Sequence, residues 1–233
     1  MNLSVDLNAD LGEGSGGDAE LFELISSANI ATGFHAGDSD TMHVAIATAK
    51  KHGVAVGAHP SFFDRENFGR KELTIPADEV FDGVAYQLGI FEAIASALDV
   101  QPNHVKPHGA LYNMACRDDA YARPIVAAAQ VFKLPLMALP GSRLRALNID
   151  GCPFIAEGFA DRRYLPDGSL VPRAQPNAYV VNVNEAVQQA EWLLREKGVQ
   201  TLCVHGDNPQ AVEFVRALRD ALLRQGFTIQ AFA

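Results

Sequence analysis

The chain has 233 residues, of which 48% are hydrophobic, and its formal net charge is -9 with a pI near 5.2. This size suits a single α/β barrel, which usually needs about 250 residues. The acidic balance argues against a nucleic-acid or membrane partner, because both call for a basic face. No apolar run approaches the roughly 18 residues of a membrane span, and the acidic start does not resemble a signal peptide. We therefore expect a cytoplasmic protein.

Short apolar runs alternate with helical patterns along the chain. The predicted strands are Leu3–Asn8, the run ending at His35, Val54–Ala58, His104–His108, Leu134–Leu139, Pro153–Glu157, Thr201–His205 and Phe227–Phe232. The predicted helices are Asp18–Ser26, Asp40–His52, Ala77–Leu98, Asp118–Phe132, Pro140–Leu147, Asn184–Lys197 and Pro209–Arg224. Such alternation without a linker predicts one domain over residues 1–233 with parallel strands.

The first strand carries three polar side chains on one face, namely Asp6, Asn8 and Asp10. Burying them in a core would be costly, so the pattern favours a strand that lines a wet site. An exposed edge strand is the alternative. The following G-E-G-S-G-G at Gly12–Gly17 satisfies the dinucleotide pattern G-x-G-x-x-G. Because the acidic residues Asp10, Glu13 and Asp18 surround the place where a pyrophosphate would lie, we interpret it as a flexible segment at the barrel mouth.

Four apolar strands end in a histidine that is followed closely by glycine or proline: His35, His59, His108 and His205. The carboxyl ends of parallel strands meet at one edge of a sheet or barrel, and active sites lie there. A single histidine at a strand end is most often structural. Four in equivalent places predict a common pocket.

Two connections are much longer than usual, Pro60–Pro76 and Gly158–Ala178. The first contains Arg70 and is interpreted as a flap over an anionic ligand. The second contains Arg163 and Arg173, whose guanidinium groups suit carboxylate or phosphate. Solvated surface charges and surface ion pairs remain the alternative for both connections.

Lys106 lies two residues before His108, so both side chains point to the same face of the predicted strand. A buried lysine needs a carboxylate or an anionic substrate, and Asp6 and Asp10 are the available partners. We expect Lys106→Met to remain folded and to lose most turnover.

Several motifs in chain order resemble the LamB/YcsF family, which is the A subunit of the bacterial ATP-dependent 5-oxoprolinase. They are D-L-N-A-D-L-G-E (Asp6–Glu13), N-I-A-T-G-F-H-A-G-D (Asn29–Asp38), G-A-H-P-S (Gly57–Ser61), K-P-H-G-A-L-Y-N (Lys106–Asn113), F-A-D-R-R-Y (Phe159–Tyr164) and V-H-G-D-N-P (Val204–Pro209). The resemblance implies an irregular TIM-like (β/α) barrel with about seven parallel strands, similar to the glycoside hydrolase/deacetylase barrels. It also implies partner subunits B and C. Ala9 and Thr32 depart from the family pattern, where we expect Cys, which argues against a thiol nucleophile there.

The implied reaction converts 5-oxoproline, ATP and water to glutamate, ADP and phosphate. A lactam is a stable amide, so its carbonyl oxygen is phosphorylated before water attacks. The candidate catalytic residues are Asp6, Asn8, Asp10, His35, His59, Lys106, His108, His205 and Asp207. The candidate substrate- or phosphate-binding residues are Glu13, Arg70, Tyr112, Arg163 and Arg173. The sequence has no P-loop, so ATP, with or without Mg²⁺, would bind without one or partly on a partner subunit.

Two other functions remain open. One is a metal-dependent amide hydrolase or deacetylase, because Asp with His residues is a common set of metal ligands. The candidate ligands for a divalent metal are Asp6, His35, His59 and His205. The other is a non-catalytic subunit of a lactam or carbohydrate pathway. If the 5-oxoprolinase interpretation holds, the chain alone should show little activity.

Overall fold

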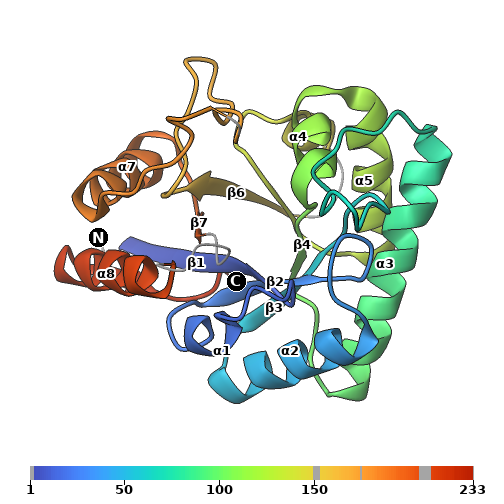
Figure 1. Cartoon of the computed structure of the whole chain (residues 1–233), viewed down its shortest axis with the longest axis horizontal. Helices are drawn as coiled ribbons and strands as arrows, with labels where there is room; N and C mark the ends of the chain where they lie inside the picture. Colours follow the sequence, from blue (N-terminus) through green and yellow to red (C-terminus); the bar gives the residue numbers. More distant parts are fainter. Residues whose placement is uncertain (1–2, 149–152, 174, 205–210, 233) are drawn as a thin grey trace.

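The computed structural model describes residues 3–148, 153–173, 175–204 and 211–232, and in this part of the chain seven parallel strands close into a barrel (Figure 1). The strands are β1 (Leu3–Leu11), β2 (Ser27–Ala31), β3 (Ala55–His59), β4 (His104–Val105), β5 (Leu136–Ala138), β6 (Phe154–Phe159), β7 (Thr201–Val204) and β8 (Phe227–Ile229). Strands β1 to β7 form the ring, and β8 pairs with β1 outside it. The predicted irregular TIM-like fold is confirmed.

The nine-residue strand β1 closes the barrel because it pairs with three neighbours along its length. Its first residues pair with β8, Asp6 begins the pairing with β7, and Asn8 begins the pairing with β2. Its side chains alternate as predicted. Polar residues face the interior, whereas residues such as Leu7 join the hydrophobic core between the strands and the helices.

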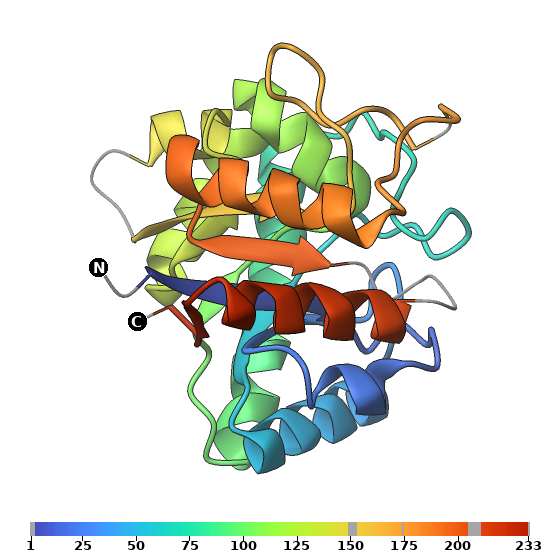
Figure 2. The ribbon, with the colours of Figure 1, turned by 90° about the vertical axis from the view of Figure 1, so that its left-hand side faces the viewer.

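The helices surround the barrel on its outer side, with α3 and α5 on one flank and α7 and α8 on the other (Figures 1 and 2). They are α1 (Asp18–Leu21), α2 (Ser39–His52), α3 (Ala77–Ala97), α4 (Gly109–Arg117), α5 (Asp119–Phe132), α6 (Arg143–Leu147), α7 (Val183–Glu196) and α8 (Ala211–Arg224). Helix α2 begins where the Asp38 carboxylate accepts the Thr41 N–H at 2.8 Å and ends at Gly53 in the left-handed conformation. None of the described helices combines the length and the apolar character that spanning a bilayer would require.

Several predicted elements are shorter than expected. Strand β2 ends at Ala31, so His35 lies in the turn that follows the strand and not at its last residue. The predicted helix Asp18–Ser26 ends at Leu21, because Ser26 belongs to the barrel, where its hydroxyl accepts the Leu7 N–H at 2.9 Å. The predicted strand His104–His108 extends only to Val105, because Pro107 has no N–H for a ladder bond.

The segment after β4 nevertheless continues along β3. The Lys106 N–H donates to the Ala58 carbonyl at 3.0 Å, and the His108 N–H donates to the Pro60 carbonyl at 2.8 Å. The side chains of Lys106 and His108 therefore still point into the barrel. Helix α4, which follows immediately at Gly109, was not predicted.

Candidate active site

The deepest polar side chain of β1 is Asp6, and it is fully engaged by hydroxyl groups. Its carboxylate accepts hydrogen bonds from Ser26 at 2.6 Å and from Ser27 and Thr201 at 2.5 Å. Burial raises its pKa, against these hydrogen bonds. Asp6 was a candidate catalytic residue and metal ligand, but the structure places it in a hydroxyl network that fastens β1 to its neighbours.

Between Asp6 and the mouth of the barrel, the interior is filled by the side-chain amides of Asn8 and Asn29 and by the imidazole of His104. The Asn29 amide donates to Asn8 Oδ1 at 2.7 Å and to Asp10 Oδ1 at 2.8 Å, and Asn29 Oδ1 lies 2.6 Å from His104 Nε2. Burial lowers the pKa of His104 to about 3, so this imidazole is neutral. A Cβ atom at Gly57 would lie 2.2 Å from His104 Nε2, so only glycine fits there. The sequence prediction did not include Asn29 or His104.

Lys106 crosses the interior between two carboxylates. Its ammonium lies 2.9 Å from Asp10 Oδ1 and 2.7 Å from Glu157 Oε1, and it also donates to Asn8 Oδ1 at 3.2 Å and to Cys203 Sγ at 3.1 Å. Burial alone would lower the pKa of Lys106, but its anionic neighbours, Asp10 first, raise the pKa well above the ordinary value. Lys106 is therefore charged.

Glu157 replaces the predicted partner Asp6 beside Lys106. It lies close to the carboxyl end of β6, as His59 does in β3, and that position was the available signal. Its other oxygen accepts the Tyr112 hydroxyl at 2.9 Å. Tyr112 was predicted to bind substrate or phosphate, and here it orients the carboxylate that pairs with Lys106.

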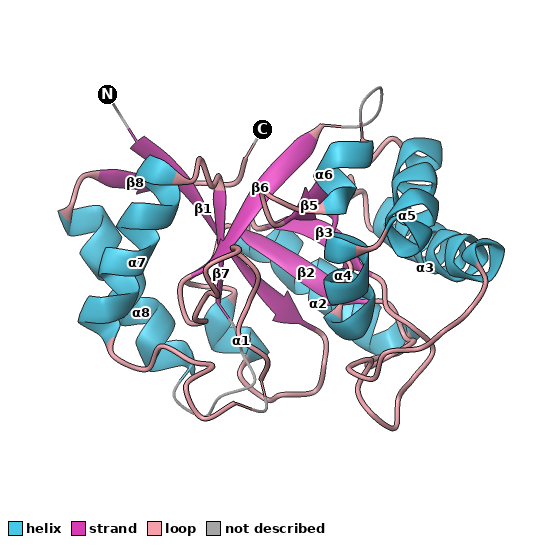
Figure 3. Ribbon diagram, turned by 90° about the horizontal axis from the view of Figure 1, so that it is seen from above, coloured by secondary structure: helices cyan, strands magenta, loops and turns pink. Residues whose placement is uncertain are grey.

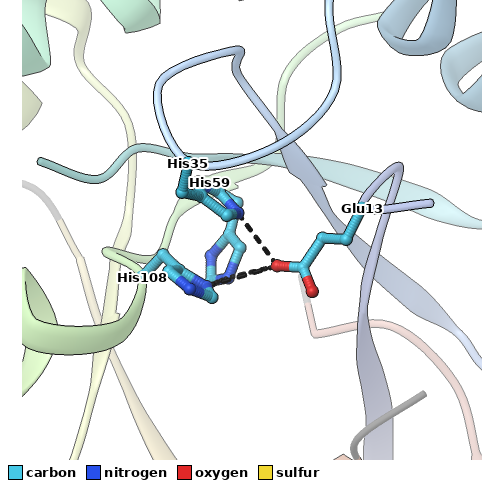
Figure 4. Close-up of side chains that lie close together, drawn as sticks. All are labelled: Glu13, His35, His59 and His108. Carbon is cyan, nitrogen blue, oxygen red and sulfur yellow. Dashed lines mark hydrogen bonds and ion pairs between the residues drawn. The ribbon is translucent and has the colours of Figure 1, made fainter. Parts of the chain in front are cut away.

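The mouth of the barrel holds four side chains that we call the histidine cluster: Glu13, His35, His59 and His108 (Figure 4). The nitrogen atoms that face Glu13 Oε1 are His35 Nε2 at 2.9 Å, His108 Nδ1 at 3.2 Å and His59 Nε2 at 3.7 Å. The rings of His35 and His108 stack with centroids 3.8 Å apart, and His59 Nε2 lies 2.9 Å from His108 Nδ1. Three of the four predicted histidines thus converge.

The four members of the cluster differ in charge state. Burial lowers the pKa of His35 to about 3 and also lowers the pKa of His108. Burial opposes protonation of His59 as well, but Asp10, whose Oδ2 lies 3.3 Å from His59 Nε2, raises its pKa above the ordinary value. Burial would raise the pKa of Glu13, yet its contacts with His108 and His35 outweigh this effect, and the pKa lies below the ordinary value. Glu13 is therefore a carboxylate.

The predicted flap lies over this cluster. The Phe68 ring makes edge contacts with His35 and His108, each at 5.5 Å between centroids, and the Phe68 carbonyl lies 2.9 Å from His108 Nε2. Gly69 packs so closely that an added Cβ would lie 2.9 Å from the Cβ of His35. The Arg70 guanidinium lies 4.9 Å from the centre of the Phe68 ring. Figure 3 shows loops gathered at the end towards which β1 points.

A buried glutamine on α3 holds the start of the same loop. Gln87 donates to the Ser61 carbonyl at 2.9 Å, and its Oε1 accepts the Ser61 N–H at 3.0 Å and the Thr32 hydroxyl at 2.8 Å. The Ser61 hydroxyl lies 3.0 Å from His35 Nδ1. Gln87 and Ser61 therefore position His35, and neither was predicted.

Two predicted binding residues, Arg163 and Arg173, make contacts with residues outside the histidine cluster. Arg163 forms an ion pair with Glu185 on α7, and Arg173 donates to the Tyr179 hydroxyl at 3.0 Å. Neither of these contacts involves the histidine cluster. His205 and Asp207 lie outside the described residues.

The histidine cluster is the set of described residues best suited to hold a metal, since its four ligand atoms lie within 4.8 Å of one another. It shares His35 and His59 with the predicted metal set and adds Glu13 and His108, whereas Asp6 lies in the hydroxyl network and His205 lies outside the described residues. Three imidazole nitrogens with one carboxylate oxygen suit Zn²⁺ or a similar ion better than Mg²⁺ or Ca²⁺.

Comparison with known proteins agrees with the sequence motifs and the barrel. The LamB/YcsF family matches residues 5–233. The crystal structure of a lactam utilization protein from Thermus thermophilus is 41% identical, with a TM-score of 0.91, over 99% of this chain and 100% of that chain. A family 4 carbohydrate esterase from Streptomyces lividans is 11% identical with a TM-score of 0.57, over 100% of this chain and 94% of its own, which is a likeness of fold. The catalytic domain of a peptidoglycan N-acetylglucosamine deacetylase from Eubacterium rectale is likewise 11% identical, with a TM-score of 0.55. The match covers 100% of this chain and 90% of that chain. The chain therefore belongs to the LamB/YcsF family.

Proposed function

We propose that this chain is a subunit of an ATP-dependent 5-oxoprolinase that opens 5-oxo-L-proline to L-glutamate together with partner subunits B and C. Membership of the LamB/YcsF family supports a lactam substrate, as does the similarity to a protein described as a lactam utilization protein. The observation that carries the proposal is the placement of a charged Lys106 and the His59–Asp10 pair beside one another at the barrel mouth.

The His59–Asp10 pair provides a base for the attacking water. The His59 ring is fixed because its Nδ1 donates to the Lys106 carbonyl at 2.7 Å, which leaves Nε2 to accept a proton. Asp10 raises the pKa of His59, so an accepted proton would be stabilised. General base catalysis of this kind typically contributes about 10²–10⁴-fold to a rate.

The Lys106 ammonium supplies positive charge where oxygen atoms of the substrate become negative during phosphorylation and hydrolysis. The carboxylates of Asp10 and Glu157 hold the ammonium in place before the substrate arrives, so little reorganisation is needed. The flap residue Phe68 limits access of bulk water to the same region.

A metal-dependent amide hydrolase is the second candidate, and the histidine cluster is the observation that favours it. Such an enzyme would need no ATP. A non-catalytic subunit would differ from both, because substitutions in the cluster would leave the activity of the complex intact.

The test is to purify the chain alone and together with subunits B and C, and to measure glutamate released from 5-oxoproline with and without ATP. We expect little glutamate from the chain alone and ATP-dependent release from the assembled complex. Release by the isolated chain without ATP would contradict the proposal and support the metal-dependent hydrolase.

A further inference from the structure

We propose that the histidine cluster binds one divalent transition-metal ion of the Zn²⁺ or Co²⁺ type. The ligand atoms are His35 Nε2, His59 Nε2, His108 Nδ1 and Glu13 Oε1. The inference goes beyond the proposed function, because ATP-dependent lactam opening does not by itself require such an ion. With the ion bound, His59 Nε2 is a ligand, so the role of base that the proposed function gives to His59 belongs to the metal-free site.

The first argument is the direction of the hydrogen bonds made by the ring nitrogens that point away from the centre. His59 Nδ1 lies 2.7 Å from the Lys106 carbonyl, and His108 Nε2 lies 2.9 Å from the Phe68 carbonyl. A carbonyl oxygen only accepts, so each of these nitrogens carries the hydrogen. In the neutral form of each ring, which a bound metal ion requires, the other nitrogen then has a lone pair that faces the cluster.

His35 follows the same pattern through a serine. The Ser61 hydroxyl donates to the Phe62 carbonyl at 2.8 Å, so its oxygen accepts the N–H of His35 Nδ1 at 3.0 Å. The lone pair on His35 Nε2 therefore faces Glu13 Oε1 at 2.9 Å. Metal-bound histidines usually have an outward N–H that donates to a carbonyl, a carboxylate or water, and this arrangement fixes the ring for coordination.

The second argument is that four electron-pair donors cannot face one another without a cation between them. A proton can join only two of the donor atoms at a time, for example His59 Nε2 and His108 Nδ1, which lie 2.9 Å apart. A metal ion can join all four. A tetrahedral ion with bonds of about 2.0–2.1 Å holds its ligand atoms about 3.3–3.4 Å apart. The separations from Glu13 Oε1 to the three nitrogens and from His59 Nε2 to His108 Nδ1, between 2.9 and 3.7 Å, bracket that value, and all four ligand atoms lie within 4.8 Å of one another.

The third argument is charge. Asp10, Glu13 and Glu157 bring three carboxylates to adjoining layers, where Lys106 is the ammonium that faces two of them. With neutral imidazoles this part of the barrel is anionic, which opposes the binding of a phosphorylated or carboxylate-bearing substrate. A divalent cation at the cluster would balance the excess negative charge. The mixture of nitrogen and oxygen ligands selects Zn²⁺ or Co²⁺ over Mg²⁺, which prefers oxygen.

The test is to strip the full chain with a chelator and titrate it with Co²⁺, following the visible absorption of the ion, and with Zn²⁺ in a calorimeter. We expect one ion per chain and a Co²⁺ spectrum of the tetrahedral type. Loss of a residue that hydrogen-bonds to a metal ligand typically lowers metal affinity by roughly 10–100-fold. His108→Ala removes a ligand itself, so it should lower the affinity for the metal by more than that. Ser61→Ala, which removes only the outer partner of His35, should weaken binding within that 10–100-fold range.

The matched control is His43→Ala, because His43 is an exposed histidine on α2 away from the cluster. It should bind one ion with unchanged affinity. If His108→Ala does not fold, as judged by circular dichroism, the Ser61→Ala result decides. Absence of binding to the wild-type chain, or equal affinity of the wild-type chain and Ser61→Ala, would overturn the proposal. The measurement uses neither ATP, lactam nor partner subunits, so its failure is distinct from a failure of the proposed function.

Discussion

Replacing Lys106 with Met should destabilise the protein strongly. From the sequence alone we expected this variant to stay folded, and the structure now predicts a large loss of unfolding free energy. The substitution preserves most of the side-chain length but leaves Asp10 and Glu157 without their shared cation. Glu157 is 0% exposed and Asp10 is 12% exposed, so water cannot replace the ammonium. Breaking a buried ion pair by removing one partner costs about 3–5 kcal/mol.

Urea denaturation followed by circular dichroism measures this loss of unfolding free energy. For a chain of this size, 1 kcal/mol corresponds to about 2–4 °C in Tm, so the melting temperature should fall by roughly 6–20 °C. Lys50→Met is the matched control, because Lys50 is half exposed and lies 4.0 Å from the exposed Asp99. The control should change the unfolding free energy by less than about 0.5 kcal/mol.

The double variant Lys106→Met/Glu157→Gln separates stability from function. It removes one of the two stranded carboxylates, so it should recover about 1 kcal/mol or more relative to Lys106→Met alone. Turnover of the reconstituted complex should stay low, because the ammonium is still missing. A Lys106→Met protein within about 0.5 kcal/mol of wild type would refute the charge balance described for the barrel interior.

Three further outcomes are expected. Gly57→Ala should lose about 3 kcal/mol or more of unfolding free energy in urea, because its Cβ would overlap the His104 ring. Gly141→Ala, where no atom lies within 4 Å of the added Cβ, should lie within about 1 kcal/mol of wild type, and similar losses in the two variants would contradict the packing argument. Gln87→Leu should cost about 2–4 kcal/mol in the same assay, since it strands both backbone groups of Ser61, and an unchanged midpoint would count against this role. Zn²⁺ at about 100 times its dissociation constant should add about 2.7 kcal/mol to the unfolding free energy, and a chelator should reverse the rise in Tm. A Tm that changes with neither Zn²⁺ nor chelator would contradict metal binding.

The sequence predicted the barrel because its strand signals were strong and local. Short apolar runs followed by a histidine predicted that His35, His59 and His108 lie at one end of the barrel, and the structure confirms this convergence, although His35 and His108 lie beyond the last residues of their strands. The alternation in β1 likewise predicted that Asp10 faces Lys106.

Other features depended on contacts between distant parts of the chain. Glu13 was predicted to bind substrate or phosphate, but it joins the cluster because the loop after β1 folds back over the mouth, and no local pattern indicated its contact with the histidines. The hydrogen bonds of Gln87 to Ser61 connect α3 to the loop after β3, and a glutamine within an amphipathic helix carries no signal for such a role. Asp6 was predicted in the site because strand alternation fixes the face of a side chain but not its depth in the barrel.

The most direct test of the account is the rate of glutamate formation by the reconstituted complex when His59 is replaced. His59 lies at the meeting point of Asp10, the histidine cluster and the Lys106 carbonyl. If the reaction takes place at this mouth, His59→Ala should lower the ATP-dependent rate by about 10²-fold or more, while the exposed control His43→Ala should keep the wild-type rate. A complex with His59→Ala that forms glutamate at the wild-type rate would place the chemistry elsewhere and contradict the account.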